Sequence, residues 1–200
     1  MGTRGRYGKY GERKRLERLR DSRAPGATPR RGIAPRQGRS SFLKGINGSP
    51  LGVRPARPTD MGYIRDLSKR SFQQYGPYHH ILSQWFELGT TITLLACQDK
   101  RAVGFAMLGR PLLNHPAPLE TEVLAIAVER NSQRKGIGDL LMREVKSAAH
   151  HMQVEKILLH TAVENVPACS LFKKHGFVPG ALKKGFYPRG QDALMMFKEM

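Results

Sequence analysis

One stretch of the sequence constrains the fold of this chain most. It is a short apolar run, followed by a polar turn, a glycine-containing loop and a helical pattern. The run extends from Val123 to Val128, and apolar residues beyond the loop recur every three or four positions to Met152. This periodicity predicts a strand, a tight loop and an amphipathic helix that begins near Lys135. The loop itself consists of Gln133, Arg134, Lys135, Gly136, Ile137 and Gly138.

The chemistry of this loop favours an anion. Glycine removes side chains where a backbone must approach a ligand closely. The first N–H groups of a helix have no partner within it, and with the helix dipole they attract negative charge. Arg134 and Lys135 add two cations beside them. We interpret the loop as a pyrophosphate cradle. It lacks the third glycine and the distant acid of the dinucleotide fingerprint, and the Gly-Lys-Ser/Thr ending of a P-loop.

Charge divides the chain into two parts. The formal net charge is +18, and residues 1–50 hold 14 of the 34 basic residues but only 3 of the 16 acidic ones. Such composition predicts that residues 1–50 are a basic, disordered tail and that residues 51–200 form the folded domain. The tail could contact RNA or the ribosome, act as a transit peptide, be an upstream extension, or be a solvated segment with no defined site.

Several classes of protein are disfavoured. Cys97 and Cys169 are too few for a disulfide framework and are expected to be small buried apolar residues. No apolar run approaches the length of a membrane span, and no signal-peptide pattern opens the chain, so we expect a cytoplasmic protein. The histidine pairs 79–80 and 150–151 do not predict a metal, because neighbouring residues on a helix point about 100° apart.

The remaining elements follow from periodicity and turn residues. Pro58-Thr59-Asp60 opens a helix that Thr59 or Asp60 can cap, and Asn165 caps a later helix that stops at Gly176. The predicted strands are 52–56 at an edge, 90–98, 102–109, 120–129, 156–162, 177–186 and 193–198; the other helices are 78–88 and about 135–152; and a Pro-rich loop covers 111–118.

The pattern Gln-Arg-x-Gly-x-Gly between a strand and a helix resembles the acetyl-CoA signature of the GNAT superfamily. Residues 156–200, with Leu-Leu-His, Glu-Asn, Leu-Phe-Lys-Lys-His-Gly-Phe and Phe-Tyr-Pro, look most like the protein N-terminal acetyltransferases, including the ribosomal-protein alanine type. The resemblance implies an α/β (α+β) GNAT fold, a mixed and mostly antiparallel sheet flanked by helices, whose parallel fourth and fifth strands splay apart. It also implies acetyl transfer from acetyl-CoA to a primary amine, expected to be a protein N-terminus, without a metal.

The same resemblance implies a set of coenzyme contacts. The pantetheine arm would lie in the splay against the backbone of one strand, and the amides of residues 134–139 would hold the pyrophosphate. Asn165 would reach the arm, or serve only as a helix cap, and the two roles can coexist. Phe172 would pack against the arm. The expected coenzyme residues are Ala125, Ile126, Ala127, Val128, Gln133, Arg134, Lys135, Gly136, Ile137, Gly138, Asp139, Asn165 and Phe172.

Two residues are candidate bases. Glu122 lies fourteen residues before Gly136, where histone-type members place a catalytic glutamate, and a carboxylate beside an apolar run is partly desolvated. Glu120 is a fallback, and a solvent-facing acid is the alternative role for Glu122. His160 interrupts an apolar run, so it must be hydrogen-bonded or functional. It matches a catalytic position of the N-terminal acetyltransferases, and the two could act together through an ordered water.

One position departs from the family pattern. Phe172 stands where many members have a tyrosine that protonates the departing thiolate, so either water or Tyr187 would have to take that role. Tyr187 could instead only pack under the last hairpin. The oxyanion donor implied by the family is the backbone N–H near Ile126.

Two other functions stay open. The first is acetylation of a small-molecule amine. The second is a catalytically weak acetyl-CoA-binding regulatory module, whose basic tail would bind RNA with a steep salt dependence that is lost when residues 1–50 are removed.

Overall fold

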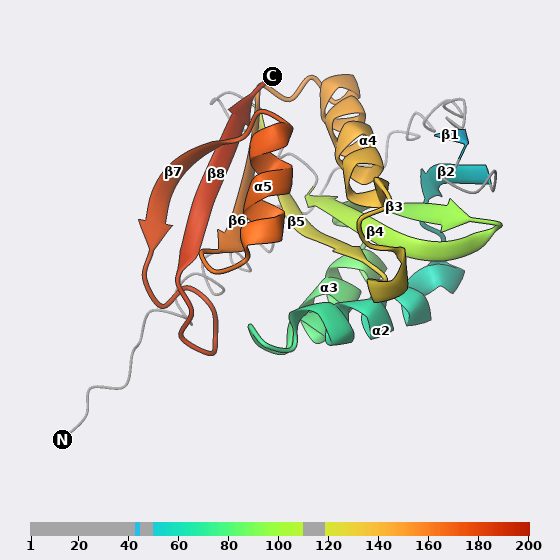
Figure 1. The fold of residues 1–200 in the computed structure, drawn as a ribbon, viewed down its shortest axis with the longest axis horizontal. Coiled ribbons are helices and arrows are strands. Elements are labelled where there is room, and N and C mark those ends of the chain that lie inside the picture. The colour runs from blue at the N-terminus through green and yellow to red at the C-terminus, as the bar shows by residue number, and fades with distance from the viewer. Residues whose placement is uncertain (1–42, 45–49, 110–118) are drawn as a thin grey trace, which may run out of the picture.

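A computed structural model describes residues 43–44, 50–109 and 119–200 (Figure 1). The predicted loop 111–118 and most of the predicted tail lie outside these residues, so the tail's contact with RNA stays a prediction. In chain order the elements are β1 Leu43–Lys44, β2 Pro50–Pro55, η1 Pro58–Asp60, α2 Met61–Phe72, α3 Tyr78–Glu87, β3 Thr91–Gln98, β4 Arg101–Gly109, β5 Glu120–Val128, η2 Arg130–Ser132, α4 Ile137–His151, β6 Lys156–Ala162, α5 Val166–Lys174, β7 Val178–Lys183 and β8 Ala193–Glu199.

The described strands form one mixed sheet in the order β1-β2-β3-β4-β5-β6-β8-β7. Helices α2 and α3 cover one face of the sheet, and α4 and α5 cover the other (Figure 1). Each face has its own core. The apolar side of α4 packs with Leu94, Ala106 and Leu159, whereas Ile64 of α2 and Leu82 of α3 pack with Phe105 on the opposite face. The predicted GNAT architecture is therefore confirmed.

The parallel pair predicted as the fourth and fifth strands is β5 and β6. These strands pair only over four residues, from Glu120 opposite Lys156 to Val123 opposite Leu159. Beyond that point the described residues of the two strands no longer pair with each other, although both strands continue. The neighbouring ladder shifts at the same place, because Met107 faces Ala125 whereas Leu108 faces Val123. The extra residue, Leu124, is a β-bulge, and bulges bend a strand away from its partner.

The edge prediction needs a correction. The strand expected at the edge is β2, yet β1 pairs with it, Leu43 opposite Leu51 and Lys44 opposite Pro50. Two residues assigned to the tail thus belong to the sheet. Pro50 and Pro55 fall at the two ends of β2, where a missing backbone donor does least harm to the ladder.

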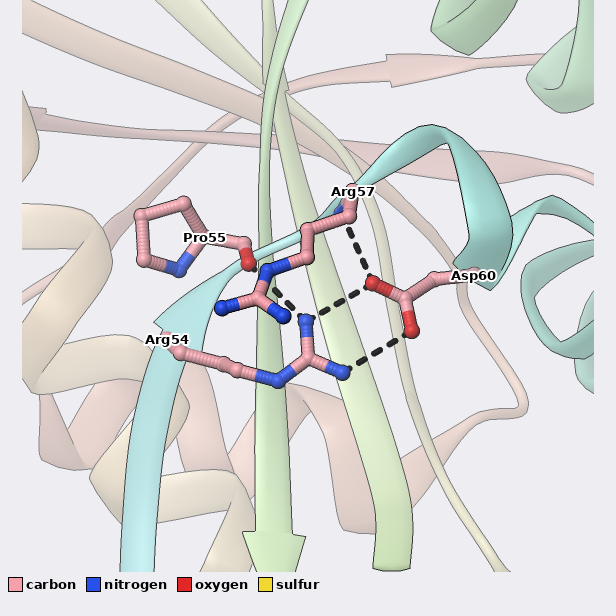
Figure 2. Close-up of polar contacts among 4 residues, drawn as sticks. All are labelled: Arg54, Pro55, Arg57 and Asp60. Atoms are coloured by element: carbon pink, nitrogen blue, oxygen red, sulfur yellow. Dashed lines mark hydrogen bonds and ion pairs between the residues drawn. The ribbon is translucent and has the colours of Figure 1, made fainter.

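The start of the first long helix also differs from the prediction. Thr59 or Asp60 is predicted to cap this helix, but the Asp60 carboxylate makes no capping hydrogen bond to α2 and turns back towards the preceding strand (Figure 2). It accepts two hydrogen bonds from the Arg54 guanidinium, at 2.7 and 2.9 Å, and one from the Arg57 backbone N–H at 2.7 Å. The Arg54 hydrogen bonds hold the pKa of Asp60 below its usual value. The two charge-assisted hydrogen bonds from Arg54 tie β2 to η1.

Candidate active site

The splay between β5 and β6 brings the two candidate bases into direct contact. The Nδ1 atom of His160 lies 3.0 Å from Oε1 of Glu122, with side chains that are 14% and 22% exposed. An ionised carboxylate can only accept, so opposite one Nδ1 would carry the proton, and Nε2 of a neutral imidazole would then keep its lone pair. Nε2 is buried and makes no hydrogen bond within the described part of the chain. This arrangement leaves a buried proton acceptor aimed away from Glu122.

The register of the sheet explains this pairing. Glu122 faces Leu158 across the parallel pair, and His160 lies two residues further along β6 on the same face. Glu120, the fallback base, lies at the other end of the pair, where its carboxylate is 3.8 Å from Nζ of Lys156. The fold therefore brings Glu122, rather than Glu120, to the histidine.

An aromatic group lies beside the imidazole. Phe186, in the connection between β7 and β8, stacks on His160 with ring centroids 4.7 Å apart and planes 11° apart. Tyr187 meets Phe186 edge-on, lies 4.8 Å from the ring of Tyr75 and 6.0 Å from that of Tyr78. We call Tyr75, Tyr78, Phe186 and Tyr187 the aromatic wall. Both aromatic segments, Tyr75-Gly76-Pro77-Tyr78 and Phe186-Tyr187-Pro188, combine aromatics with proline, and this pattern could have identified Tyr75 and Tyr78, which sequence reasoning missed.

Tyr187, the candidate acid, is buried at 9% exposure within this wall. Burial raises the pKa of its phenol, so the group stays neutral and is a weaker acid than a free tyrosine. It contacts His160 only indirectly, through Phe186. The packing role considered for Tyr187 is thus present, and its role as an acid stays a prediction.

The two loops that carry the wall are fastened to each other. The side-chain amide of Gln191 donates to the carbonyl of Gln74 at 2.7 Å. Gly76 has φ 145°, and a Cβ added there would lie 2.9 Å from Cγ of Pro188. Glycine is therefore required at position 76, both for its backbone conformation and for the close approach of Pro188.

The predicted phosphate loop precedes α4, as expected, but the helix begins at Ile137 rather than near Lys135. Gly136 is the N-cap residue, with φ 78°, and Arg134 also has positive φ, 61°. The side-chain amide of Gln133 donates to the carbonyl of Val128 at 3.0 Å and so ties the loop to the end of β5. Arg134 and Lys135 are exposed and form no ion pair within the described residues.

The two loop glycines serve different purposes. At Gly136 a Cβ would meet nothing within 4 Å, so glycine is favoured there by the left-handed backbone conformation and not by a lack of space. At Gly138 a Cβ would lie 3.2 Å from Leu171 of α5, so this glycine permits close packing of α4 and α5. Ile137 is 2% exposed and belongs to the core, so its side chain is not available to a coenzyme. The loop thus presents backbone rather than side chains.

The remaining predicted coenzyme residues lie around this loop and the splay. The Asp139 carboxylate binds Nζ of Lys174 at 2.9 Å and Nε2 of His175 at 3.0 Å, so only its amide is available to a phosphate. Asn165 caps α5 by accepting from the Ala168 N–H at 3.3 Å, which confirms its capping role. Phe172 is 4% exposed and packs 6.0 Å from Phe177 in the core. Ala125, Ile126, Ala127 and Val128 follow the bulge on β5, where pairing with β6 has ended.

This geometry fits a coenzyme with a peptide-like arm and a pyrophosphate. The β5 backbone beyond Val123 lacks a β6 partner, and the loop offers helix N-terminal amides beside two unpaired cations. Within the described residues, no group of three or more His, Cys, Asp or Glu side chains could hold a metal ion. The described helices include none with the length and apolar character needed to cross a membrane.

Comparison with known proteins agrees with this geometry. The model of the Acetyltransferase (GNAT) family matches residues 61–177. An N-alpha-acetyltransferase of Saccharolobus solfataricus is 28% identical over 160 residues, covering 76% of this chain and 95% of the relative. The L-amino acid N-acetyltransferase AaaT of Escherichia coli is 32% identical over 110 residues, covering 52% and 65%. The structure of Arabidopsis thaliana NAA60 with a bisubstrate analogue has a TM-score of 0.66 at 18% identity, covering 74% and 97%.

Proposed function

Since the chain belongs to the GNAT acetyltransferase family and is an acetyl-CoA-dependent N-acetyltransferase, we propose that its acceptor is a protein N-terminal α-amine and that His160 is its general base. The observation that carries the proposal is the hydrogen bond between His160 Nδ1 and Glu122 at the point where β5 and β6 separate. The similarity to an N-alpha-acetyltransferase over most of both chains supports the choice of acceptor.

Acid–base chemistry also favours an α-amine. The attacking nitrogen must be neutral, and an α-amine has a pKa of about 7.7–8.0 against about 10.4 for lysine. A single imidazole acting near neutral pH can take the proton of an α-amine far more readily than that of a lysine. No stronger base is needed in the site.

Acetyl-CoA supplies the thioester carbonyl carbon to which the amine nitrogen bonds as the carbon–sulfur bond breaks. His160 Nε2 accepts the proton of the attacking amine, and Glu122 holds the imidazole in the correct tautomer and stabilises its protonated form. Phe186 fixes the plane of the ring by stacking on it. In our proposal Tyr187 or water protonates the thiolate, and the backbone N–H near Ile126 stabilises the oxyanion.

The coenzyme residues are assigned on the same basis. The backbone of Ala125 to Val128 lies along the splay, and the amides following Gly136 lie at the N-terminus of α4. Arg134 and Lys135 add charge beside those amides. Asn165 and Phe172 lie on α5 and its cap, and their coenzyme contacts remain proposals alongside their capping and core roles.

The test is coenzyme release with N-terminal peptides by the wild type, His160→Ala and Glu122→Gln across pH. Loss of the base should lower kcat/KM about 100- to 1,000-fold and remove one ionisation from the pH profile. Glu122→Gln should lower kcat/KM less than His160→Ala does, because Nε2 of His160 is still present. Some loss is expected, because the protonated ring is no longer stabilised by a carboxylate. The control is Tyr63→Phe. Tyr63 lies on α2, and its buried hydroxyl makes no hydrogen bond in the described residues. Wild-type rates in both site variants would refute the assignment.

A small-molecule acceptor is the second candidate, because the similarity to an L-amino acid N-acetyltransferase gives it specific support. Offering free amino acids and small amines beside the peptides separates the two. Turnover of the small acceptors alone would replace our proposal with this one.

A further inference from the structure

The connection between β7 and β8 carries positive charge beside the proposed base. Strand β7 and its connection to β8, residues 178–192, contain three basic residues, Lys183, Lys184 and Arg189, and one acidic residue, Asp192. Lys184 is neutralised, because its Nζ lies 2.7 Å from Asp192, which also accepts from the Gly185 N–H. Lys183 and Arg189 are exposed and form no ion pair within the described residues. Two free cations therefore remain on this connection.

The position of Lys183 relative to His160 follows from the contacts that both side chains make with Phe186. Its Nζ lies 5.6 Å from the centroid of Phe186, and Phe186 stacks on the imidazole at 4.7 Å. The ammonium therefore lies within about 10 Å of the imidazole, which an extended peptide spans in about three residues at ~3.3 Å each.

The backbone of Arg189 belongs to the loop that carries the aromatic wall. It follows Pro188, which packs against Gly76, and it lies between Tyr187 and Gly190, whose backbones hydrogen-bond at 2.8 Å. One exposed carboxylate, Glu164, acts electrostatically on Tyr187 but pairs with neither cation in the described structure. On this segment Lys183 and Arg189 thus remain as two cations without an ion pair among the described residues.

We propose that Lys183 and Arg189 select acceptors with acidic side chains at the second to fourth residues. The inference rests on the proposed function, since it concerns the acceptor of the same site. Like-charged peptides are repelled, whereas acidic ones are attracted both during encounter and in the complex.

The experiment compares three peptides that all begin with Ala and differ at positions two to four. The acidic peptide carries Asp and Glu there, the neutral peptide carries Asn and Gln, and the basic peptide carries Arg. We expect kcat/KM for the acidic peptide to exceed that for the neutral one about fivefold at low salt, with the basic peptide lowest. High salt should bring the three values together, because exposed charges are screened. Coenzyme affinity should not depend on the peptide.

The variants sharpen the test. Lys183→Gln should abolish most of the preference and Lys183→Glu should reverse it. Arg143→Glu, an exposed position on α4 on the opposite face of the sheet, makes the same charge change and should leave the preference intact. Equal turnover of all three peptides by the wild type would overturn the inference while leaving the proposed function standing. Turnover of none of them, with small amines accepted, would overturn both.

Discussion

At the scale of single residues, Gly76 joins the two loops of the aromatic wall. Its φ of 145° and the approach of Pro188 leave no room for a side chain. We expect Gly76→Ala to destabilise the protein by about 1–3 kcal/mol, to raise KM for peptides and to lower kcat, because the wall moves and its member Phe186 stacks on His160. Thermal unfolding and peptide kinetics measure the two effects.

Gly62→Ala provides a matched control for this substitution. Gly62 lies within α2, and a Cβ there would meet nothing within 4 Å. Alanine is the better helix former by about 1 kcal/mol, so this variant should be as stable as the wild type or more stable, with unchanged KM. A Gly76→Ala enzyme that behaved like the Gly62→Ala enzyme would show that the contact with Pro188 does not position the wall.

Residue type predicted much of the site, but not its contacts. A glutamate beside an apolar run and a histidine inside one can be recognised separately in the sequence. Their hydrogen bond joins residues 38 positions apart and depends on a register that places Glu122 opposite Leu158. The stack of Phe186 on His160 depends in turn on how the last connection folds back, and no local pattern encodes that path.

At the scale of elements, the junction of α4 with α5 is held by a partly exposed charge cluster of Asp139, Lys174 and His175. Partial burial alone would raise the pKa of Asp139, but hydrogen bonds from Lys174 and His175 hold it below the usual value. A carboxyl with a lowered folded pKa adds stability above its unfolded pKa of about 3.9, and this stability is lost as pH falls through the folded value. Acid should therefore loosen this junction.

Asp139→Asn tests this expectation. The free energy of unfolding of this variant should be about 1 kcal/mol lower than that of the wild type at pH 7. This difference in free energy should shrink as pH falls below 4. The measurement is urea unfolding at several pH values. Asp66→Asn, an exposed position on α2 whose side chain is 62% exposed, should show no comparable pH-dependent loss. A constant difference between wild type and Asp139→Asn at every pH would contradict the linkage.

The order and type of the elements were largely predictable, because long periodic segments and their caps are local signals. The short features were not. β1 has only two residues, and the bulge at Leu124 follows from a shift in pairing with β4 that no periodicity in β5 reveals. The role of Asp60 depended on Arg54, which lies on the preceding strand and so offers a tertiary partner rather than a helical one.

At the scale of the whole molecule, the sheet consists of two parts joined by a narrow seam. The strands from β1 to β5 form one part and β6, β8 and β7 the other, and four paired positions of β5 and β6 connect them. The packing of α4 against α5 and the contact between the Gly76 and Pro188 loops reinforce the seam on its two faces. A coenzyme arm in the splay would lie along this seam and bind both parts at once.

This arrangement predicts that acetyl-CoA stabilises the whole fold in one transition. At a concentration 100 times its Kd, a ligand that binds only the folded protein adds about 2.7 kcal/mol, which for a chain of this size raises Tm by about 5–10 °C. Replacing Arg134 and Lys135 with Glu should remove most of the shift without lowering the Tm of the free protein, because both side chains are exposed and unpaired in the described structure. Arg143→Glu should keep the shift. If acetyl-CoA raised the Tm of the Arg134→Glu/Lys135→Glu variant as much as that of the wild type, the pyrophosphate would have to bind away from the loop before α4. Protein contacts alone would then hold the two parts of the sheet together.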